Sequence, residues 1–333
     1  MATIYDIASE AGVSASTVSR ALKGSRLVSD DVRERVEKVA KDLGFERRTV
    51  RRHRGRAILS VRLVLPHHDN PERALFYDFE QLIIGLREGL APSSCNLICD
   101  TSSDNYDPFP HKKGGDTDAF IFAFHEPDAA VLAALKKRSI PVVVLNRTLA
   151  GVPCVTSDYA SGMSDLVEHI ITGAKGSPVK AAFVGIDSNN VVFRERLEGW
   201  TRALTASGLA PDPEKQVVYF DNFKAIDTPA VRKLAQSFNV LFCVNDLVAT
   251  AVLAELGRAG ISVPDHCQVT GFDDSPVRGL TRPLLTTVKM PVHEFAFQAG
   301  RELANRIIES TPMPLCIRIT GLLLPGQSTF PTP

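Results

Sequence analysis

The first residues whose types and spacing suggest chemistry lie in the stretch TIYDIASEAGVSASTVSRAL, which runs from Thr3 to Leu22. Its second half places short side chains (Ala15, Ser16, Thr17, Ser19) beside one long cation, Arg20. Short side chains let a helix approach the floor of a DNA groove, and arginine makes the bidentate contact to guanine that is the commonest specific base contact. The stretch therefore has the composition of a DNA-reading helix. An ordinary amphipathic helix pair in an α-helical domain is the alternative interpretation.

The same stretch predicts two short helices joined by a tight turn. Apolar residues recur at helical spacing over residues 4–11, and Thr3 followed by Asp6 forms a near capping box. Gly12 can supply the positive φ that ends a helix, and Ser14 can cap the next helix. The turn between the two helices is therefore expected at residues 12–14.

A third helix is expected to begin at Ser29 and to end at Gly44. The apolar stripe of this helix consists of Val32, Val36, Val39 and Leu43. Packed against Ile7, Val18 and Leu22, this stripe would close a small three-helix core. A core of this size is marginal without support from DNA or from the rest of the chain.

Charge is distributed unevenly along a chain whose net charge is zero. Residues 1–56 contain thirteen Lys or Arg and eight Asp or Glu, which gives about +5 there and leaves about −5 for the remainder. Residues 47–56, RRTVRRHRGR, hold six arginines and no acid, and a solvated linker is the simplest interpretation because like charges repel. A basic module on a mildly acidic body is typical of a DNA reader with a separate regulatory domain.

Composition is that of an ordinary globular chain of two or three domains, with 333 residues, 44% hydrophobic and 23% charged. The six cysteines form no CxxC pair, so we expect buried reduced thiols and neither a metal nor a cofactor. The N-terminus has no signal-peptide pattern, and no window reaches eighteen apolar residues. The expected location is therefore the cytoplasm, without a membrane.

From Ala57 onward, strands alternate with helical stretches, which predicts parallel sheets in a doubly wound α/β arrangement. More than two hundred residues of this pattern indicate two such subdomains with a cleft between them. The expected helices cover residues 79–90, 127–138, 160–172, 194–207, 228–237 and 246–259. The stretch from Cys99 to Asp118 is an exception, because its prolines and paired glycines make a regular helix improbable.

Polar residues follow the predicted strands, at the edge where ligands bind in open α/β sheets. They are His67, His68, Asp69, Asn70, Asn146, Arg147, Asp187, Ser188, Asn245, Asp246, Asp273 and Asp274. Each of them alone could simply cap a helix at a strand–helix junction. As a set, they favour a ligand site.

The headpiece sequence TIYDIASEAGVSASTVSRALKG, followed by LVSDDVRERVEKVAKDLGF, resembles the DNA-binding headpiece of the lactose-repressor/galactose-repressor (LacI/GalR) family. The resemblance implies that Ala15, Ser16 and Arg20 face base edges. It also implies phosphate contacts that position the helix without reading sequence. These contacts would come from Tyr5, Thr17, Ser19, and Lys23 or Arg26, and Thr3 is a further expected DNA contact.

In this family the basic segment is a hinge that becomes helical on operator DNA and inserts a leucine into the minor groove. Here Arg54 stands at the position of that leucine, and Arg47 replaces the usual proline. An arginine suits a narrow, electronegative minor groove rather than intercalation. We therefore expect Arg51 and Arg54 to contribute charge to binding, with less DNA bending than a leucine wedge produces.

The body of the chain resembles the periplasmic-sugar-binding-protein fold of the same family, through RERLEGW, VNDLVATAVL, GISVPDHCQVTGFDD and LLTTVKMP. The resemblance implies an effector site for a sugar or a nucleoside in the cleft. The expected contacts are Asn70, Phe76, Asn146, Arg196, Phe220 (or Phe223), Asn245 and Asp273. Arg and carboxylate groups suit vicinal hydroxyls, and aromatic faces suit the apolar side of a ring.

The resulting prediction is an effector-controlled transcriptional regulator, a repressor, that binds a pseudo-palindromic double-stranded operator as a homodimer. Its expected parts are a headpiece at 1–46, a hinge at 47–57 and a core at 58–333. The core would divide into an N-subdomain (58–157 and 287–317) and a C-subdomain (158–286 and 318–333).

Two other classes of protein are weaker alternatives. An enzyme is disfavoured because GxSxG, HExxH, a P-loop and GxGxxG after the first strand are absent. A cytoplasmic sugar-binding or sugar-processing protein without DNA regulation would not need the headpiece, and a transport protein would need a signal peptide.

Overall fold

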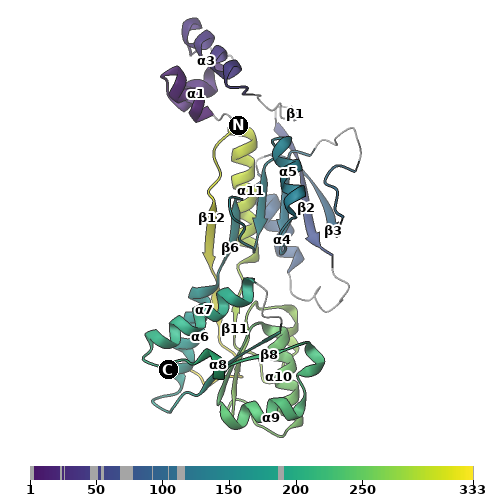
Figure 1. The fold of residues 1–333 in the computed structure, drawn as a ribbon, viewed down its shortest axis with the longest axis vertical. Coiled ribbons are helices and arrows are strands. Elements are labelled where there is room, and N and C mark those ends of the chain that lie inside the picture. The colour runs from purple at the N-terminus through teal and green to yellow at the C-terminus, as the bar shows by residue number, and fades with distance from the viewer. Residues whose placement is uncertain are drawn as a thin grey trace. The chain divides into compact units, whose positions relative to one another are not determined.

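The computed structural model describes residues 4–22, 25, 27–45, 52–53, 56–67, 78–91, 93–103, 105–110, 117–186 and 191–332. The chain divides into two compact units (Figure 1). The first unit comprises Met1–Pro66, Gly85–Cys154 and Ala296–Cys316. The second unit comprises His67–Ile84, Val155–Phe295 and Ile317–Pro333. The predicted fold class, a small helical headpiece followed by a parallel-sheet α/β core, is confirmed.

The headpiece (residues 4–45) contains α1 (Ile4–Ala11), α2 (Ala15–Leu22) and α3 (Asp30–Asp42). Gly12 ends α1 with φ +64°, as predicted. Ser14 caps α2, because its Oγ accepts a hydrogen bond from the amide of Thr17 at 3.1 Å. The three helices share one apolar core, which consists of Ile4, Ile7, Ala8, Ala11, Val18, Ala21, Val28, Val36 and Ala40.

The predicted apolar stripe of α3 is wrong at one position. Val36 is fully buried, whereas Leu43 is 39% exposed. The helix ends at Asp42, so Leu43 lies beyond the last turn, and Gly44 follows with φ +63°. Ala40 takes the inward place instead, one turn after Val36.

The sheet of the first unit is arranged around its longest strand, β2 (Arg56–Pro66). This strand pairs in parallel with β3 (Ser94–Ser102) on one side and β4 (Ala119–Ala123) on the other. The sheet continues from β4 through β5 (Val142–Leu145) to β6 (Cys154–Asp158) and β12 (Cys316–Thr320), of which only the first residues, Cys154 and Cys316, belong to the first unit. A two-residue strand, β1 (Arg52–His53), pairs antiparallel with the start of β2. The described part of the basic segment is therefore extended backbone.

The described residues between β3 and β4 contain no helix, as their composition predicted. Aromatic side chains cover the sheet there instead. The ring of Tyr106 meets Phe122 edge-on with centroids 6.3 Å apart, and Phe109 meets Phe120 at 6.2 Å. Arg138 stacks on Phe109, with Cζ 3.6 Å from the ring centroid. Individual aromatic rings thus protect this sheet face from water without a regular helix.

Three further helices are α4 (Phe79–Gly89), α5 (Ala129–Lys137) and α11 (Val292–Glu309). The first two match their predicted positions. The sequence analysis did not assign α11, although Phe295, Ala299 and Leu303 lie on one buried stripe at helical spacing.

Four parallel strands form the second unit's sheet, in the order β8 (Val217–Phe220), β7 (Ala181–Ile186), β9 (Val240–Cys243) and β10 (Gln268–Thr270). Its long helices are α6 (Tyr159–Gly173), α7 (Val191–Ala206), α9 (Thr228–Ser237) and α10 (Asp246–Arg258). Its shorter elements are α8 (Pro213–Gln216), η2 (Phe223–Ala225), η3 (Pro276–Leu280), and the antiparallel pair β11 (Thr287–Lys289) and β13 (Leu322–Leu324).

Close packing of α6 against α7 explains one glycine in the RERLEGW motif. A Cβ atom at Gly199 would lie 2.8 Å from the Cα atom of Ala160 on α6. The neighbouring Trp200, the only tryptophan of the chain, is fully buried and lies against Phe183 and Phe242. Trp200 is therefore a specific reporter of the second unit.

The cysteine prediction is only partly correct. All six cysteines are free thiols, but Cys99 and Cys316 are exposed, whereas Cys154, Cys243 and Cys267 are buried. Cys99 lies on β3, which among the described strands pairs with β2 alone, and Cys316 lies on β12 at the far end of the sheet order. Side chains on such outer strands are less covered than those on central strands. Over the part of the chain that is described, no helix has the length and apolar character needed to cross a membrane.

Candidate functional site

The headpiece presents α2 with one face in the core and the opposite face to solvent. Val18 and Ala21 are buried, whereas Ser16 and Arg20 are exposed. The other predicted DNA contacts on the described helices, Ala15, Thr17, Ser19 and Tyr5, are half-buried or exposed and lie outside the buried core. The short outer side chains let the backbone of α2 approach a partner surface closely, with Arg20 extending beyond them.

Hydroxyl groups gather at the start of α2. Ser14 Oγ lies 2.8 Å from both Ser16 Oγ and Thr17 Oγ1. The first turn of a helix leaves backbone amides unpaired, and it favours negative charge. These hydroxyls and amides therefore suit phosphate oxygens, which position a reading helix on DNA.

Seven predicted contacts lie outside the described residues. They are Thr3, Lys23, Arg26, Arg51 and Arg54 for DNA, and Asn70 and Phe76 for the effector.

In the second unit, the predicted effector residue Arg196 is enclosed by protein. Its side chain is 3% exposed and forms a buried ion pair through Nη2 with Asp273 Oδ1. Nη1 donates to the carbonyl of Val244 at 2.5 Å. The guanidinium Cζ lies 4.1 Å from the ring centroid of Phe272 and 4.8 Å from that of Tyr159. Only Nε is buried without a hydrogen-bond partner among the described residues.

The turn that carries Asp273 is held in a rare backbone conformation. Asp273 has φ 112° and Asp274 has φ 54°, in the region that disfavours most side chains. Backbone hydrogen bonding to strand β11 fixes this turn, since the amide of Asp273 donates to the carbonyl of Val288 at 2.8 Å. Strain of this kind persists only where surrounding contacts impose it, and it is commonest at functional sites.

Asp246 supports the turn from beneath, and the sequence analysis gave it no role beyond a strand-end position. It is fully buried and accepts hydrogen bonds from the amide of Ser275 at 2.7 Å and from Thr287 Oγ1 at 2.6 Å. Burial, together with the nearby charge of Asp273, raises the pKa of Asp246 to about 8. A Cβ atom at Gly271 would overlap Asp246 Oδ1, so the glycine of the TGFDD motif makes room for this carboxyl group.

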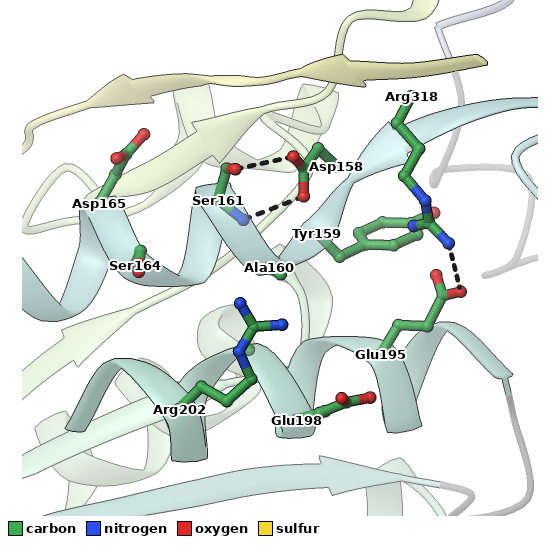
Figure 2. A pocket seen from close by; sticks show the side chains of 11 residues that line it. Asp158, Tyr159, Ala160, Ser161, Ser164, Asp165, Glu195, Glu198, Arg202 and Arg318 are labelled. Carbon is green, nitrogen blue, oxygen red and sulfur yellow. Dashed lines mark hydrogen bonds and ion pairs between the residues drawn. The ribbon is translucent and has the colours of Figure 1, made fainter. Parts of the chain in front are cut away.

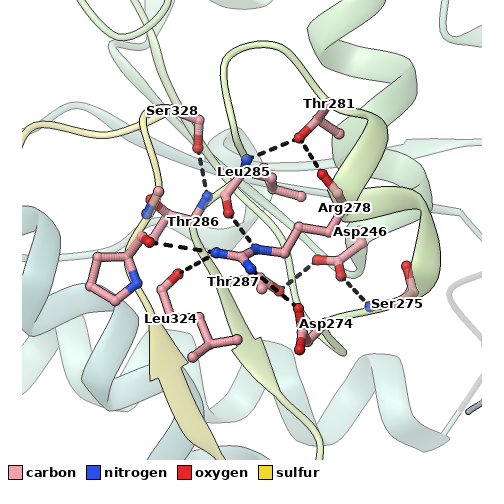
Figure 3. Close-up of polar contacts among 12 residues, drawn as sticks. Asp246, Asp274, Ser275, Arg278, Thr281, Leu285, Thr286, Thr287, Leu324 and Ser328 are labelled. Carbon is pink, nitrogen blue, oxygen red and sulfur yellow. Dashed lines mark hydrogen bonds and ion pairs between the residues drawn. The ribbon is translucent and has the colours of Figure 1, made fainter.

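Arg278 holds the same turn from the side (Figure 3). Its Nε donates to the carbonyl of Leu285 at 2.8 Å, and its Nη1 lies 3.4 Å from Asp274 Oδ1. Nη2 reaches the carbonyl of Leu324, next to the C-terminal segment, at 3.5 Å. Arg278 thereby compensates the charge of Asp274. The sequence analysis assigned Arg278 no role, because its hydrogen bonds to the carbonyls of Leu285 and Leu324 depend on how the chain folds back on this turn.

The other predicted effector residues have structural tasks as well. Asn245 caps α10, since its Oδ1 accepts from the amide of Val248 at 2.9 Å. Phe220 ends β8, half-buried against the core of the second unit. Asn146 belongs to the first unit, where it follows β5, is buried, and has φ 56°. Arg196, Asp273, Asn245 and Phe220 thus all lie in the second unit, at or after the carboxyl ends of its strands or on α7.

Two cavities of the second unit differ in whether predicted effector residues line them. A cavity of about 300 Å³ is lined by Asp273 and Asp274 together with residues of α4 and the start of α11. A larger cavity of about 500 Å³ lies between α6 and α7 and contains none of the predicted effector residues (Figure 2). Two pairs of its polar lining groups interact with one another: Ser161 Oγ donates to Asp158 at 2.7 Å, and Arg318 lies 3.6 Å from Glu195. The smaller cavity is therefore the better effector candidate.

Metal binding finds no support in the described part of the chain. No group of three or more His, Cys, Asp or Glu is placed there to hold an ion.

Comparison with known proteins identifies both parts of the chain. Residues 3–48 match the family described as bacterial regulatory proteins, lacI family, and residues 179–329 match the periplasmic binding protein-like domain. The ribose operon repressor of Bacillus subtilis (strain 168) is 30% identical over 322 residues, which cover 94% of each chain. Catabolite control protein A of Priestia megaterium is 28% identical over 338 residues, which cover 98% of this chain and 99% of that protein.

A solved structure of the transcriptional regulator CelR in complex with cellobiose has a TM-score of 0.65 and 26% identity, and covers 98% of this chain and 100% of that chain. Members of this family are DNA-binding regulators and not enzymes. The headpiece geometry, the α/β core and the full-length similarity agree, and the chain belongs to the lacI family of bacterial regulatory proteins.

Proposed function

We propose that this DNA-binding transcriptional regulator acts as a repressor, binds its operator as a homodimer, and is controlled by a sugar bound in the core. The observation that carries the proposal is the outer face of α2, where short side chains surround exposed Arg20 on a packed three-helix scaffold. The sugar component is supported by the relatives, among them a ribose operon repressor and a regulator solved with cellobiose.

For DNA, we assign base contacts to Ala15, Ser16 and Arg20. Phosphate contacts are assigned to Thr3, Tyr5, Thr17, Ser19, Lys23 and Arg26. Two headpieces related by a two-fold axis would read the two halves of a pseudo-palindrome. Arg51 and Arg54 would add charge along the minor groove and favour a straighter operator than a leucine wedge does.

For the effector, we assign contacts to Asn70, Phe76, Asn146, Arg196, Phe220, Asn245 and Asp273. The effector site and the headpiece are distinct sites, so the response of operator affinity to sugar is an allosteric coupling. We further propose the boundaries 1–46, 47–57 and 58–333 for headpiece, hinge and core, and a cytoplasmic location.

Selection of operator sequences from a random duplex library tests the DNA assignment directly. The full chain should enrich a pseudo-palindromic sequence, and the enriched duplex can then be titrated by fluorescence anisotropy with and without ribose or cellobiose. Arg51→Ala should weaken binding to all duplexes and flatten the salt dependence by about one unit of slope. Failure to enrich any sequence would remove the proposal, and enrichment without a sugar response would remove only its effector component.

A further inference from the structure

Two of the six cysteines stand opposite each other where the chain passes from the first unit to the second. We propose that Cys154 and Cys316 form a modification site, at which a hydroperoxide oxidises the two thiols to a reversible disulfide. Both residues are reduced thiols in the structure. The proposal goes beyond the proposed function, because neither DNA nor a sugar takes part in it.

The first step is the register of β6 and β12, which are neighbours in one sheet (Figure 1). Both strands leave the first unit after their first residue, so they run in the same direction. In the parallel pair of β4 and β5, the amide of Phe120 donates to the carbonyl just before its register partner, Val142. In the same way, the amide of Cys154 donates to the carbonyl of Leu315 at 2.9 Å. The residue opposite Cys154 is therefore Cys316.

The second step is that this arrangement meets the geometry of a disulfide. Residues directly opposite each other on neighbouring strands place their side chains on the same face of the sheet. Neighbouring strands lie about 4.7–4.9 Å apart, and disulfides usually join Cα atoms about 4.4–6.8 Å apart. The Cβ atoms of a disulfide are closer, at about 3.5–4.5 Å, so the bond has to draw the two strands slightly together. A bond formed in this way is easily reduced, which is typical of regulatory disulfides.

The third step is that the other four cysteines do not share these properties. Opposite Cys95 and Cys99 on β2 stand leucines, and the two cysteines are four residues apart on one extended strand, about 13 Å, which is too far for a disulfide. Cys243 and Cys267 are enclosed by protein. Burial raises the pKa of both thiols, that of Cys267 to about 12, which suppresses the reactive thiolate.

The fourth step assigns different roles to the two thiols of the site. Cys316 is exposed on an outer strand, so a hydroperoxide reaches its sulfur first, whereas Cys154 is only 4% exposed. The thiolate of Cys316 attacks one peroxide oxygen. The S–O bond forms, the O–O bond breaks and hydroxide leaves, so the sulfur is oxidised to a sulfenic acid and the peroxide is reduced.

The second half of the reaction needs a neighbouring thiol, which Cys154 supplies. Its sulfur attacks the sulfur of Cys316, the S–S bond forms, the S–O bond breaks, and the hydroxyl group leaves as water with the proton of Cys154. The hydroxide of the first half takes up the proton that the Cys316 thiol released. Two thiols and one hydrogen peroxide thus become one disulfide and two water molecules.

The position of the site in the chain gives the bond its consequence. Cys154 and Cys316 are each the last residue of the first unit before the chain enters the second. The disulfide would therefore join the chain covalently at two of its passages between the units. Disulfides that form in reducing compartments are usually transient and redox-sensing. The site makes an oxidant a second signal that acts on this chain, beside the proposed effector.

The test exposes the reduced full chain to hydrogen peroxide, blocks the remaining thiols with N-ethylmaleimide under denaturing conditions, and maps cross-linked peptides by mass spectrometry. The wild-type chain should yield a cross-link between Cys154 and Cys316 of the same molecule, and dithiothreitol should remove it. Cys99→Ser, the matched control, removes the other exposed cysteine and should leave the yield of this cross-link unchanged.

Two further variants separate the roles of the thiols. Cys316→Ser should abolish the intramolecular cross-link. Cys154→Ser should stop the reaction at the sulfenic acid, so dimedone should label Cys316 several-fold more strongly than in the wild-type chain. Urea unfolding monitored by Trp200 verifies that both variants are folded. Since Cys316→Ser changes an exposed side chain, it keeps the test valid even if serine at the buried position 154 prevents folding.

Three results would overturn the proposal. The first is oxidation of Cys316 to the sulfinic acid in the wild-type chain without any cross-link to Cys154. The second is a cross-link only between two chains through Cys99. The third is equal dimedone labelling of Cys316 in folded Cys154→Ser and in the wild-type chain, which would show that Cys154 does not react with the sulfenic acid.

Discussion

Arg20 and Arg196 show how differently the two ends of this chain use the same side chain. Arg20 projects from α2 into solvent, among short polar residues and outside the headpiece core. Arg196 is 3% exposed and is surrounded by the carboxylate of Asp273, a backbone carbonyl and two aromatic rings. The exposed arginine is available to a partner, whereas the buried one is held in place by contacts within the second unit.

This difference in burial decides whether an arginine contributes mainly to the binding of a partner or to the stability of the fold. Removing an exposed cation costs the fold little, because water already solvates the charge and its contacts within the protein are weak. A buried cation has been stripped of water, and removing it leaves its partner charge uncompensated. Loss of Arg20 should therefore weaken DNA binding and leave folding unchanged, whereas loss of Arg196 should destabilise the second unit.

The largest effect is expected for Arg196→Ala, which should destabilise the second unit by about 3–5 kcal/mol because the buried carboxylate of Asp273 would lose its ion pair with Arg196. Urea unfolding monitored by Trp200 fluorescence reports on this unit alone. Arg202→Ala, an exposed arginine on the same helix, is the control and should leave the transition unchanged. An unaltered unfolding transition in Arg196→Ala would contradict this contrast between the two arginines, since the buried arginine would then contribute only to ligand binding.

The next largest effect is expected for Arg20→Ala on operator binding. Loss of a bidentate base contact should cost about 1–3 kcal/mol and relax the preference at one base pair, while the Trp200 transition remains unchanged. Anisotropy titrations with single-base operator variants measure both quantities. Arg35→Ala on α3, also exposed, serves as the matched control. A uniform loss across all operator variants would reassign Arg20 to a phosphate contact.

A smaller effect is expected from pH, at most about 1.4 kcal/mol per pH unit for one group. Burial and Asp273 raise the pKa of Asp246 to about 8, so the folded unit retains a proton that the unfolded chain releases, and stability falls as pH rises toward 8. Burial lowers the pKa of His169 below 6.5, so stability also falls as pH drops below that value.

Asp246→Asn should therefore flatten the stability of the second unit between pH 6.5 and 8. Trp200-monitored unfolding at several pH values measures this slope, with Asp165→Asn as a control for a carboxylate in the cavity between α6 and α7. A slope that persists in Asp246→Asn would assign the alkaline loss to another group.

The smallest effect is expected at the helix cap of the headpiece. Ser14→Ala removes the acceptor for the amide of Thr17 and should cost about 1 kcal/mol of local stability. Hydrogen exchange of the α2 amides in the full chain should accelerate, while amides of the second unit keep their rates. Ser9→Ala, an exposed position inside α1, is the control. Equal acceleration in both variants would show that the cap does not stabilise α2.

The sequence predicted the headpiece well because its signals are local. Gly12, Ser14 and Gly44 act on residues within one turn of themselves, and their roles appear in the structure as predicted. The alternation of strands and helices identified the parallel sheets for the same reason. The prediction was wrong for Leu43, Cys99 and Cys316, where exposure depends on the end of a helix or on the position of a strand in a sheet.

Local pattern would also have found α11, whose apolar residues recur every three or four positions. By contrast, no local pattern indicates that Arg196 is caged or that Arg278 reaches Leu285 and Leu324. The same is true of Asp246 beneath the Asp273–Asp274 turn. These contacts define the shape and charge of the effector candidate.

The sequence by itself determined the helices of the headpiece, the α/β class of the core and the polar residues at the strand ends, because periodicity, capping and turn chemistry act between near neighbours. Only the tertiary structure decided which of those polar residues remain accessible. Arg196 and Asp273 are 77 positions apart in the chain, and their pairing depends on the order of strands in one sheet. Burial and charge compensation arise from such distant contacts, and they decide whether an arginine serves a ligand, the fold or both.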